Sequence, residues 1–511
     1  MNQRVLIANR GEIAIRIIRA CRDLGWETIA VYDQGEENAL HVQLADDAYA
    51  LTSAQPIPYL DQAALMTIAT RSGATCVHPG YGFLAENAAF AELVTDAGIT
   101  YVGPPASAIR TMGDKVAARA AAVAAGVPIL PGTIEPVADL AAVRNWADEH
   151  GYPVALKAAA GGGGRGFRVA RGESELADAF ASAQSESSRA FGDDRLYVER
   201  YLERPRHVEI QVFADAQGMV VALGDRDCSI QRRHQKLLEE APAPGLSEDL
   251  RNRMAEVSIR LTRAVGYFSA GTLEFLVEPD ETFWFLEMNT RIQVEHTVTE
   301  EIFGIDLVRE QLLVAIGQPM SFAPSIQPRG HAIQFRINAE DPGRSFAPAP
   351  GPIHRFVPPL GTGIRVDTAV TSGSVISDRY DSMIAKLVVT GRNRDEVIAR
   401  GQRALAEMQI KGVPTTQALH QNILASDRFQ SANLSVGFLA DEPGVVPAPA
   451  LQSALEPDAP EPWSEQVVEV NGKRFSVRRP ASHSLPTSTS SSPRPKRNRS
   501  RHSNTLSNTS G

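Results

Sequence analysis

The sequence contains few cysteines. Only three of its 511 residues are of this type (Cys21, Cys76 and Cys228), and no two of them are spaced as Cys-x-x-Cys. Such a sparse, odd set excludes a disulfide framework and a thiolate zinc site. We expect three small buried side chains in a reducing compartment.

A leader peptide and a long apolar segment are also missing. The chain passes from Met1 directly into a short apolar run and the charged string NRGE, without a basic region followed by an apolar core. The long apolar stretch at residues 117–130 is interrupted by Arg and Gly and is shorter than the roughly 20 residues that span a bilayer. We expect a soluble, cytoplasmic protein without a membrane contact.

Acidic residues are absent from the last part of the chain. Residues 470–511 contain nine Lys and Arg and no Asp or Glu, so the first 469 residues carry −18 of a total net charge of −9. A strongly acidic body argues against nucleic acid as the main ligand. Residues 481–511 contain ten serines and almost no apolar side chain, so we predict a disordered tail there.

The arrangement of apolar runs predicts about three domains. In residues 1–114, short apolar runs alternate with amphipathic stretches, which is typical of a parallel sheet flanked by helices. Residues 115–318 then contain a small α+β lobe, at about 130–203, followed by long strands. A further strand-rich domain follows at 330–440, and a linker at 441–480 contains a strand-like piece with Asn-Gly as a hairpin signal.

A glycine run lies between two predicted strands of the lobe. The string GGGGRG (161–166) formally matches the dinucleotide fingerprint, but a strand follows it instead of a helix. A glycine-rich hairpin tip brings backbone N–H groups close to phosphate oxygens, and Lys157 at its entrance favours that interpretation. The alternative is a flexible linker, and Lys115 and Lys157 taken singly resemble ordinary surface lysines.

Two glutamates are predicted to face each other. Glu274 and Glu287 lie at equal distances from the turn between Asp280 and Glu281, so an antiparallel hairpin centred there pairs them, and Asn289 shares their face. Like charges at paired positions are destabilising unless a cation joins them, which indicates an oxygen site for Mg²⁺ or Mn²⁺. A register shift that turns one carboxylate to solvent is the alternative.

Polar side chains also gather next to this pair. In the string RIQVEH, Arg291, Gln293 and Glu295 alternate and are predicted to share one face of an extended segment, where they would hold and deprotonate a small oxyanion. An exposed polar strand face is the alternative. The cationic string RDCSIQRRHQK (226–236) indicates an anion pocket as readily as a solvated surface.

Ten strings in order resemble the biotin carboxylase family over residues 1 to about 440: IANRGEIAIRIIRA, HPGYGFLAEN, MGDK, KAAAGGGGRGFR, PRHVEIQ, RDCSIQRRHQK, EEAPAPG, EFLVE, EMNTRIQVEH and RINAEDP. The resemblance implies a multidomain α/β and α+β protein with a Rossmann-like N-terminal domain, an ATP-grasp domain and a C-terminal biotin carboxylase domain. It also implies ATP, Mg²⁺ or Mn²⁺ (two ions) and biotin as cofactors.

The resemblance implies a role for each matching residue. ATP binding is implied for Lys115, Lys157, Gly161, Gly162, Gly163, Gly164, Glu199, Arg200, Leu202, His207, Gln231 and His234, where Arg200 replaces a lysine that is common in the family. Metal binding is implied for Glu274, Glu287 and Asn289, and bicarbonate binding for Lys236, Arg291, Gln293, Val294 and Glu295. Biotin is implied at Tyr81, Arg336 and Asp381, and the catalytic set is Lys236, Arg291, Glu295 and Arg336.

The implied reaction is the carboxylation of biotin through carboxyphosphate, the first half-reaction of an acyl-CoA carboxylase. The implied partners are a biotinyl carrier domain or protein, a carboxyltransferase β chain and further copies of the chain. No Met-Lys-Met carrier site occurs, so the carrier is expected on another chain or on a longer natural product, and the Ser/Arg-rich tail is compatible with a truncation or an altered reading frame. Another ATP-grasp ligase that forms an acyl or carbamoyl phosphate is the enzymatic alternative; an ATP-binding regulatory chain is the non-enzymatic one.

Overall fold

The computed structural model describes residues 3–133, 135–158, 166–191, 193–451 and 463–480. The chain divides into two units, Met1–Glu456 and Pro457–Gly511, which are considered separately. The predicted tail at 481–511 and the glycines at 161–164 lie outside the described residues.

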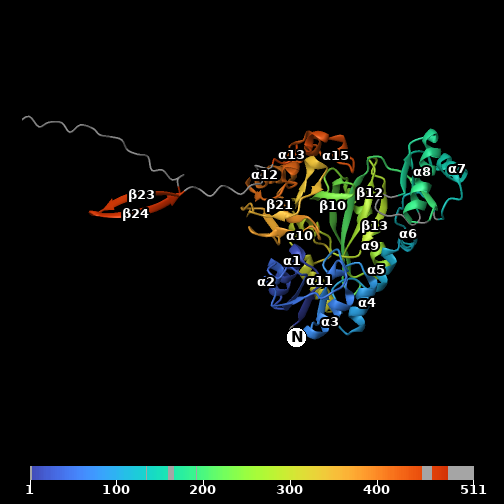
Figure 1. The fold of residues 1–511 in the computed structure, drawn as a ribbon. Coiled ribbons are helices and arrows are strands. Elements are labelled where there is room, and N and C mark those ends of the chain that lie inside the picture. The colour runs from blue at the N-terminus through green and yellow to red at the C-terminus, as the bar shows by residue number, and fades with distance from the viewer. Residues whose placement is uncertain (1–2, 134, 159–165, 192, 452–462, 481–511) are drawn as a thin grey trace, which may run out of the picture. The chain divides into compact units, whose positions relative to one another are not determined.

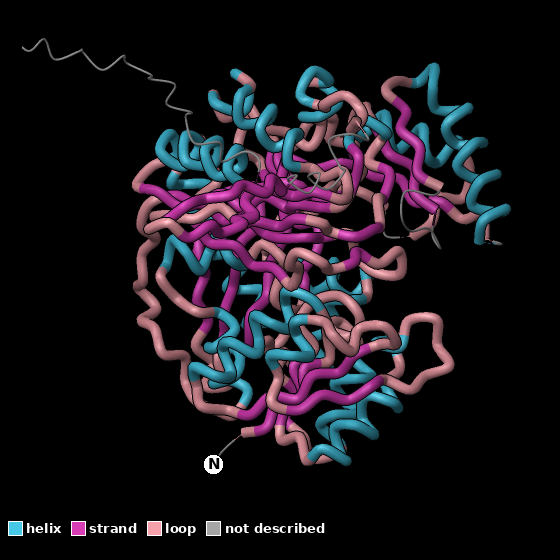
Figure 2. Tube along the Cα trace, turned by 60° about the vertical axis from the view of Figure 1, so that its left-hand side comes forward, coloured by secondary structure: helices cyan, strands magenta, loops and turns pink. Residues whose placement is uncertain are grey.

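The N-terminal part is a parallel sheet with helices on both sides (Figures 1 and 2), as predicted. Its strand order is β3-β2-β1-β4-β5, and every pair in it is parallel. The elements are β1 (Arg4–Ile7), α1 (Gly11–Asp23), β2 (Glu27–Tyr32), α2 (Leu40–Leu44), β3 (Asp47–Ala50), α3 (Gln62–Ser72), β4 (Cys76–His78), α4 (Ala88–Asp96), β5 (Thr100–Tyr101), α5 (Ala106–Gly113) and α6 (Lys115–Ala124).

The predicted small lobe is a three-stranded antiparallel sheet of order β7-β6-β8 with two helices. It consists of α7 (Leu140–His150), β6 (Val154–Ala158), β7 (Phe167–Ala170), α8 (Glu173–Phe191) and β8 (Leu196–Arg200). Val154, Leu156 and Val198 pack against the helices and form the core of the lobe. The glycine run therefore does connect two paired strands, β6 and β7.

One antiparallel sheet of order β13-β12-β9-β10-β11-β14-β21-β19 spans the rest of this unit. Its strands are β9 (Arg206–Ala214), β10 (Val220–Arg232), β11 (Gln235–Ala241), β12 (Ser269–Val277), β13 (Phe283–Asn289), β14 (His331–Asn338), β19 (Ile364–Thr368) and β21 (Met383–Gly391). Because β11 pairs with β14, strands from two predicted domains belong to a single sheet. This pairing places residues near 239 beside residues near 336.

The two faces of this sheet have different coverings. Along β9, Val208 and Ile210 pack against α9 (Glu248–Ala264), and along β14, Phe335 packs near α12 (Arg394–Glu407). The alternate residues turn to α10 (His296–Phe303), where Thr297 bonds to Gln334. Strand alternation thus separates an apolar face from a polar face on which α10 lies.

The remaining elements are one helix that contacts α1 and β12, followed by the short strands and helices after residue 339. They are α11 (Leu307–Ala315), β15 (Glu340–Asp341), β16 (Ala347–Pro348), β17 (Gly351–Pro352), β18 (Arg355–Val357), β20 (Val375–Ile376), β22 (Gln409–Lys411), α13 (Gln417–Ala425), α14 (Asp427–Gln430) and α15 (Phe438–Asp441). Several longer helices begin after a side chain that accepts a hydrogen bond from the first turn, as Asp306 does for α11 and Asn393 for α12. Such caps satisfy N–H groups that have no partner within the helix.

The second unit contains a hairpin of β23 (Trp463–Val470) and β24 (Lys473–Pro480). Asn471 and Gly472 form its turn with φ values of 53° and 77°, so the Asn-Gly signal predicted this turn correctly. Within the part of the chain that the structure describes, the helices are too short or too polar to cross a bilayer.

Candidate active site

A row of charged side chains crosses four neighbouring strands on the polar face of the large sheet. Glu287 of β13 pairs with Glu274 of β12, Glu274 with Glu209 of β9, and Glu209 with Arg226 of β10. Paired residues project from the same face of a sheet. The register therefore brings three carboxylates next to one another, as sequence symmetry predicted for the first two.

The symmetry argument reached the right pair, but the hairpin is not uniform. Phe275 pairs with Phe285 and Glu274 with Glu287, so Leu286 is an extra residue that forms a β-bulge. The bulge turns the exposed Glu287 side chain onto the face of Glu274. Partial burial and the Glu274 carboxylate raise the pKa of Glu287 above its ordinary value. A cation at this position would relieve that repulsion.

Lys236 of β11 is the cation that neutralises the buried carboxylates. Its Nζ lies 2.7 Å from Glu209 Oε2, 2.8 Å from Glu274 Oε1 and 2.7 Å from Glu295 Oε1, and its side chain is 11% exposed. Burial alone would lower the pKa of Lys236, but the three carboxylates outweigh it and hold that pKa well above its usual value. The ammonium is therefore charged at neutral pH.

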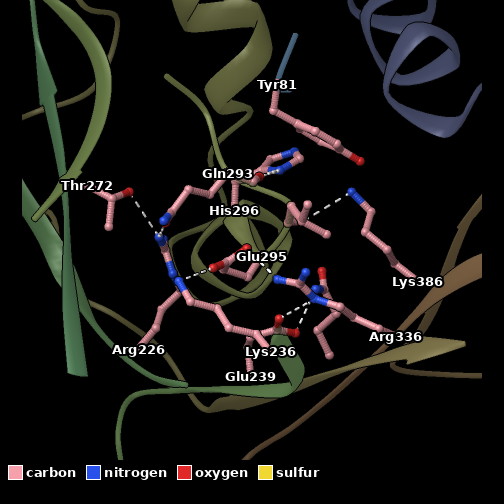
Figure 3. A network of polar contacts seen from close by, with 12 residues as sticks. Tyr81, Arg226, Lys236, Glu239, Thr272, Gln293, Glu295, His296, Arg336 and Lys386 are labelled. Carbon is pink, nitrogen blue, oxygen red and sulfur yellow. Dashed lines mark hydrogen bonds and ion pairs between the residues drawn. The ribbon is translucent and has the colours of Figure 1, made fainter. Parts of the chain in front are cut away.

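Glu295 lies between two cations. One carboxylate oxygen accepts from Lys236, and the other accepts from Arg336 Nη2 at 2.9 Å (Figure 3). Burial favours the protonated acid, but Lys236 and Arg336 prevail and lower the pKa of Glu295. Arg336 Nε also donates to Glu239 Oε1 at 2.5 Å. The result is an ionised acceptor flanked by two positively charged donors, which suits a small oxyanion.

The string that contains Arg291, Gln293 and Glu295 is not a strand. It is an irregular segment that ends in a turn, and Glu295 is the residue immediately before α10. Gln293 donates to Glu274 Oε1 at 2.8 Å, whereas Arg291 donates to Glu86 Oε2 at 3.0 Å and to Asn289 Oδ1 at 2.8 Å. The prediction of an extended segment was wrong, so the alternation rule does not apply to these residues.

The carboxylate pair is suited to a hard divalent cation. Carboxylate and amide oxygens are the ligands that Mg²⁺ and Mn²⁺ prefer, and Glu274, Glu287 and Asn289 supply them at neighbouring positions. In this structure Asn289 Nδ2 donates to Glu274 Oε1 at 2.9 Å, and His207 Nε2 lies 3.0 Å from Glu274 Oε2. The donor set fits the predicted metal.

Most of the predicted nucleotide residues lie on or beside the lobe. Lys157 of β6 pairs with Glu199 of β8 through their charged ends, and Arg200 donates to Glu278 Oε2 at 2.8 Å. Leu202 is buried, and Lys115 is exposed as the first residue of α6. These side chains come from the lobe and from the helix that precedes it.

The other predicted nucleotide residues lie on the large sheet. His207 and Gln231 are buried, whereas His234 is exposed in the turn between β10 and β11. Arg233 and His234 have φ values of 48° and 68°, a region that residues with side chains rarely adopt. Strained turns of this kind persist where the surrounding structure requires them, often at functional sites.

The residues predicted near biotin come from separate segments. The Tyr81 hydroxyl bonds Glu12 Oε1, whereas Asp381 is exposed and accepts from the Met383 N–H at 2.9 Å. The adjacent Phe83 and Tyr380 rings are 6.2 Å apart, edge to face. This aromatic contact joins the loop of Tyr81 to the loop of Asp381.

Several site residues were not predicted individually from the sequence: Glu12, Glu86, Glu209, Glu239 and Lys386, while Arg226 was included only in the cationic string 226–236. Arg226 is fully buried and donates to Glu209, Gln211, Thr272, Gln293 and Thr299. Alternation in HVEIQ, with Glu209 on the face of His207, was a usable signal for one of them. Lys386, a single lysine in an apolar strand, was another.

Three family models match the chain consecutively. Residues 1–109 match the N-terminal domain of biotin carboxylase, residues 114–323 the ATP-binding domain of the carbamoyl-phosphate synthase L chain, and residues 334–441 the C-terminal domain of biotin carboxylase. The central match agrees with the ATP-grasp fold inferred from sequence. The matches on either side of it are both to domains of biotin carboxylase, so the order of the three domains is that of this family.

Individual relatives are similar over most of the chain. The α3 subunit of biotin-dependent acyl-coenzyme A carboxylase from Mycobacterium leprae is 46% identical over 94% of this chain and 82% of its own length. Biotin carboxylase 1 of Bacillus subtilis is 49% identical over 86% of this chain and 98% of its own length. Such coverage shows a common domain arrangement.

Solved structures agree. The biotin carboxylase domain dimer of 2-oxoglutarate carboxylase from Hydrogenobacter thermophilus, in complex with MgADP, ADP and bicarbonate, has a TM-score of 0.81 and 44% identity, covering 88% of this chain and 99% of its own. A β-γ-ATP complex of biotin carboxylase from Campylobacter jejuni has a TM-score of 0.81 and 42% identity, covering 86% of this chain and 99% of its own. The chain belongs to the biotin carboxylase family.

Proposed function

We propose that this protein uses ATP and bicarbonate to carboxylate biotin, as the first half-reaction of an acyl-CoA carboxylase. The observation that carries the proposal is the position of Glu295, a buried carboxylate between Lys236 and Arg336 and next to the Glu274–Glu287 pair. Family membership supports bicarbonate, ATP and biotin as the molecules that meet there.

The side chains fit distinct tasks in this reaction. Lys236 and Arg336, which flank Glu295, bind the bicarbonate oxygens with Gln293 and Val294, and Glu295 accepts the bicarbonate proton. Arg291, which pairs with Glu86 and Asn289 in this structure, is assigned to the same anion from the family resemblance. The deprotonated oxygen attacks the γ-phosphorus of ATP and ADP leaves, which yields carboxyphosphate. The carboxyl group then passes to a ureido nitrogen of biotin, whose proton goes to the departing phosphate. Arg336 places positive charge where negative charge develops on biotin, beside Tyr81 and Asp381.

Nucleotide binding is assigned to residues of the lobe and of the neighbouring sheet. Lys115 and Lys157 are suited to the phosphates as exposed ammonium groups, and Glu199, Arg200, Leu202, His207, Gln231 and His234 surround the nucleotide in our proposal. Glu274, Glu287 and Asn289 hold Mg²⁺ or Mn²⁺, as one or two ions. A bound metal ion would neutralise charge on the phosphates during transfer.

The proposal extends to partners and location. The acyl-CoA carboxylase subunit among the relatives supports a biotinyl carrier and a carboxyltransferase β chain as partners, and the dimeric structural relative supports a homo-oligomer. Three free, buried cysteines are in keeping with a reducing cytoplasm. Turnover of a purified biotinylated carrier tests the first of these partners.

The decisive assay measures ADP release with bicarbonate and free biotin. We expect biotin to stimulate bicarbonate-dependent ADP release, and Glu295→Gln to lower it by about 10²–10⁴-fold because the proton acceptor is lost. Glu256→Gln, on an exposed position of α9, is the matched control and should keep full activity. Undiminished activity of Glu295→Gln would overturn the proposed base. A failure of biotin to stimulate would favour an ATP-grasp ligase with another acceptor.

A further inference from the structure

Lys386 is a buried cation beside the proposed site to which the proposed reaction gives no role. It lies on β21, where it pairs with Arg336 of β14 on one side and with Asp367 of β19 on the other. Its side chain is 0% exposed. Burying an ammonium is costly unless charged or polar partners compensate, so its partners identify what it holds in place.

The partners of Lys386 belong to two other segments that approach the site. Its Nζ donates to the backbone carbonyl of Val294 at 3.2 Å, in the turn that carries Glu295. It also lies 3.0 Å from Glu12 Oε2, in the first turn of α1. Asp367 Oδ2 is farther away, at 3.9 Å. One ammonium group therefore joins the turn of Glu295 to the N-terminal sheet domain.

Glu12 carries the connection further. Its second oxygen, Oε1, accepts the hydrogen bond from the Tyr81 hydroxyl. The Lys386 ammonium lies 5.9 Å from the centre of the Tyr81 ring, and both side chains are labelled in Figure 3. The loop of Tyr81 is also fixed by Asn9, whose Nδ2 donates to the carbonyls of Pro79 and Tyr81 at 2.7 Å each. One oxygen of Glu12 therefore forms an ion pair with the cation that holds the turn of Glu295, and the other accepts from the loop of Tyr81.

Lys386 is therefore placed to act through its neighbours, and within the described part of the chain it forms no hydrogen bond or ion pair with the proposed base. Lys386 contacts a backbone carbonyl and a carboxylate that itself faces Tyr81, whereas the proposed base is held by Lys236 and Arg336. An apolar residue of similar size would fill the same space without the cost of a buried charge. The charged pair does what an apolar residue cannot, because it bonds two loops at once and fixes their separation.

We propose that Lys386 and Glu12 are positioning residues that couple the turn of Glu295 to the loop of Tyr81. This inference rests on the proposed function. The pair holds the bicarbonate-activating side and the biotin side in one arrangement, so that carboxyphosphate forms where biotin can accept the carboxyl group. Without the pair, ATP is still cleaved, but a larger share of carboxyphosphate is lost to water.

The test compares two products of the purified full-length protein in one reaction. The reaction contains ATP, bicarbonate and free biotin, and the amounts of carboxybiotin and ADP formed are both measured. The unfolding midpoint of each variant is recorded as well. For Lys386→Met we expect the ratio of carboxybiotin to ADP to fall about tenfold, and KM for biotin to rise more than KM for bicarbonate. Glu12→Gln keeps an acceptor for Tyr81 but loses the ion pair, so its ratio should fall less. This nearly isosteric variant decides the question if Lys386→Met does not fold.

A matched control separates positioning from simple stability. Arg394→Met breaks the buried ion pair with Glu240, which lies 2.5 Å away and is not part of the proposed site. It should lower the unfolding midpoint and leave the product ratio unchanged. If the Lys386 and Glu12 variants behave like Arg394→Met, the coupling role is overturned and the proposed function stands. If the wild type shows no biotin-stimulated ADP release, the proposed function itself fails, and the coupling role with it.

Discussion

The two sides of the proposed site are constructed differently. On and beside the large sheet, Lys236, Glu209 and Glu295 are almost fully buried, and the lysine already forms an ion pair with each carboxylate. On the three-stranded lobe, the Lys157 side chain is 44% exposed and its partner is a single carboxylate, that of Glu199. The first side is fixed before substrate arrives, and the second can adjust around it.

This difference follows from the chemistry proposed for each side. A small oxyanion offers few atoms to bind, so charges fixed in advance are needed to select and deprotonate it. A nucleotide is large and must enter and leave, which favours exposed cations on a lobe that can close over it. The large sheet supplies rigidity because neighbouring strands fix the row from Glu287 to Arg226.

The largest expected difference between the two sides concerns stability. Lys236→Met leaves Glu209, Glu274 and Glu295 buried without their common cation, so we expect a loss of about 3–5 kcal/mol in the free energy of unfolding. Lys157→Met removes an exposed pair and should cost under about 1 kcal/mol. Urea denaturation of both variants measures this. Equal losses would contradict the division into a fixed and an adjustable side.

A second difference should appear as a dependence on pH. Burial is the main cause that raises the pKa of Glu239 to about 7, with Glu295 adding to it and Arg336 opposing it. The native state therefore holds the Glu239 proton more tightly than the unfolded chain does. This contribution to stability is fully present below about pH 4.5 and is lost as the pH rises through about 7.

The variant Glu239→Gln isolates that contribution. The difference in the free energy of unfolding, variant minus wild type, should increase by on the order of 1–3 kcal/mol when the pH is raised from 5 to 8. The reason is that glutamine mimics the protonated acid at both pH values. Denaturant unfolding at both pH values gives the difference, in which unchanged groups cancel. Asp193→Asn on the lobe is the control, since a hydrogen bond from Arg195 lowers the pKa of Asp193 to about 2. Its stability relative to wild type should be the same at both pH values.

The sequence predicted local pattern better than long-range pairing. The parallel sheet, the lobe and the facing glutamates followed from alternation and turn signals, which act over a few residues. The pairing of β11 with β14, which places Arg336 beside Glu239, joins segments about a hundred residues apart, and only packing determines it. Lys386 could not be assigned for the same reason, because its partners Glu12 and Val294 come from other domains.

Two predictions show where the alternation rule holds and where it ends. It placed Arg291 with Glu295, but the strand ends at Asn289, and the two side chains bond different partners. It also placed Glu287 opposite Glu274. The turn is centred half a residue away from the predicted point, and the extra residue Leu286 restores the predicted pairing. Bulges and irregular segments at a site depend on tertiary packing, so they cannot be predicted from the alternation of neighbouring residues.

Glu287 gives the smallest expected effect on stability, and its sign is opposite to that of Lys236. Because Glu287 faces Glu274, Glu287→Gln should raise the free energy of unfolding by about 0.2–1 kcal/mol without metal. Mn²⁺ should stabilise the wild type through binding to the native state, and this gain should be largely lost in the variant. Unfolding midpoints with and without Mn²⁺ measure both effects. A variant that is less stable without metal, yet gains as much from Mn²⁺ as wild type, would show that Glu287 supports the hairpin and does not bind the ion.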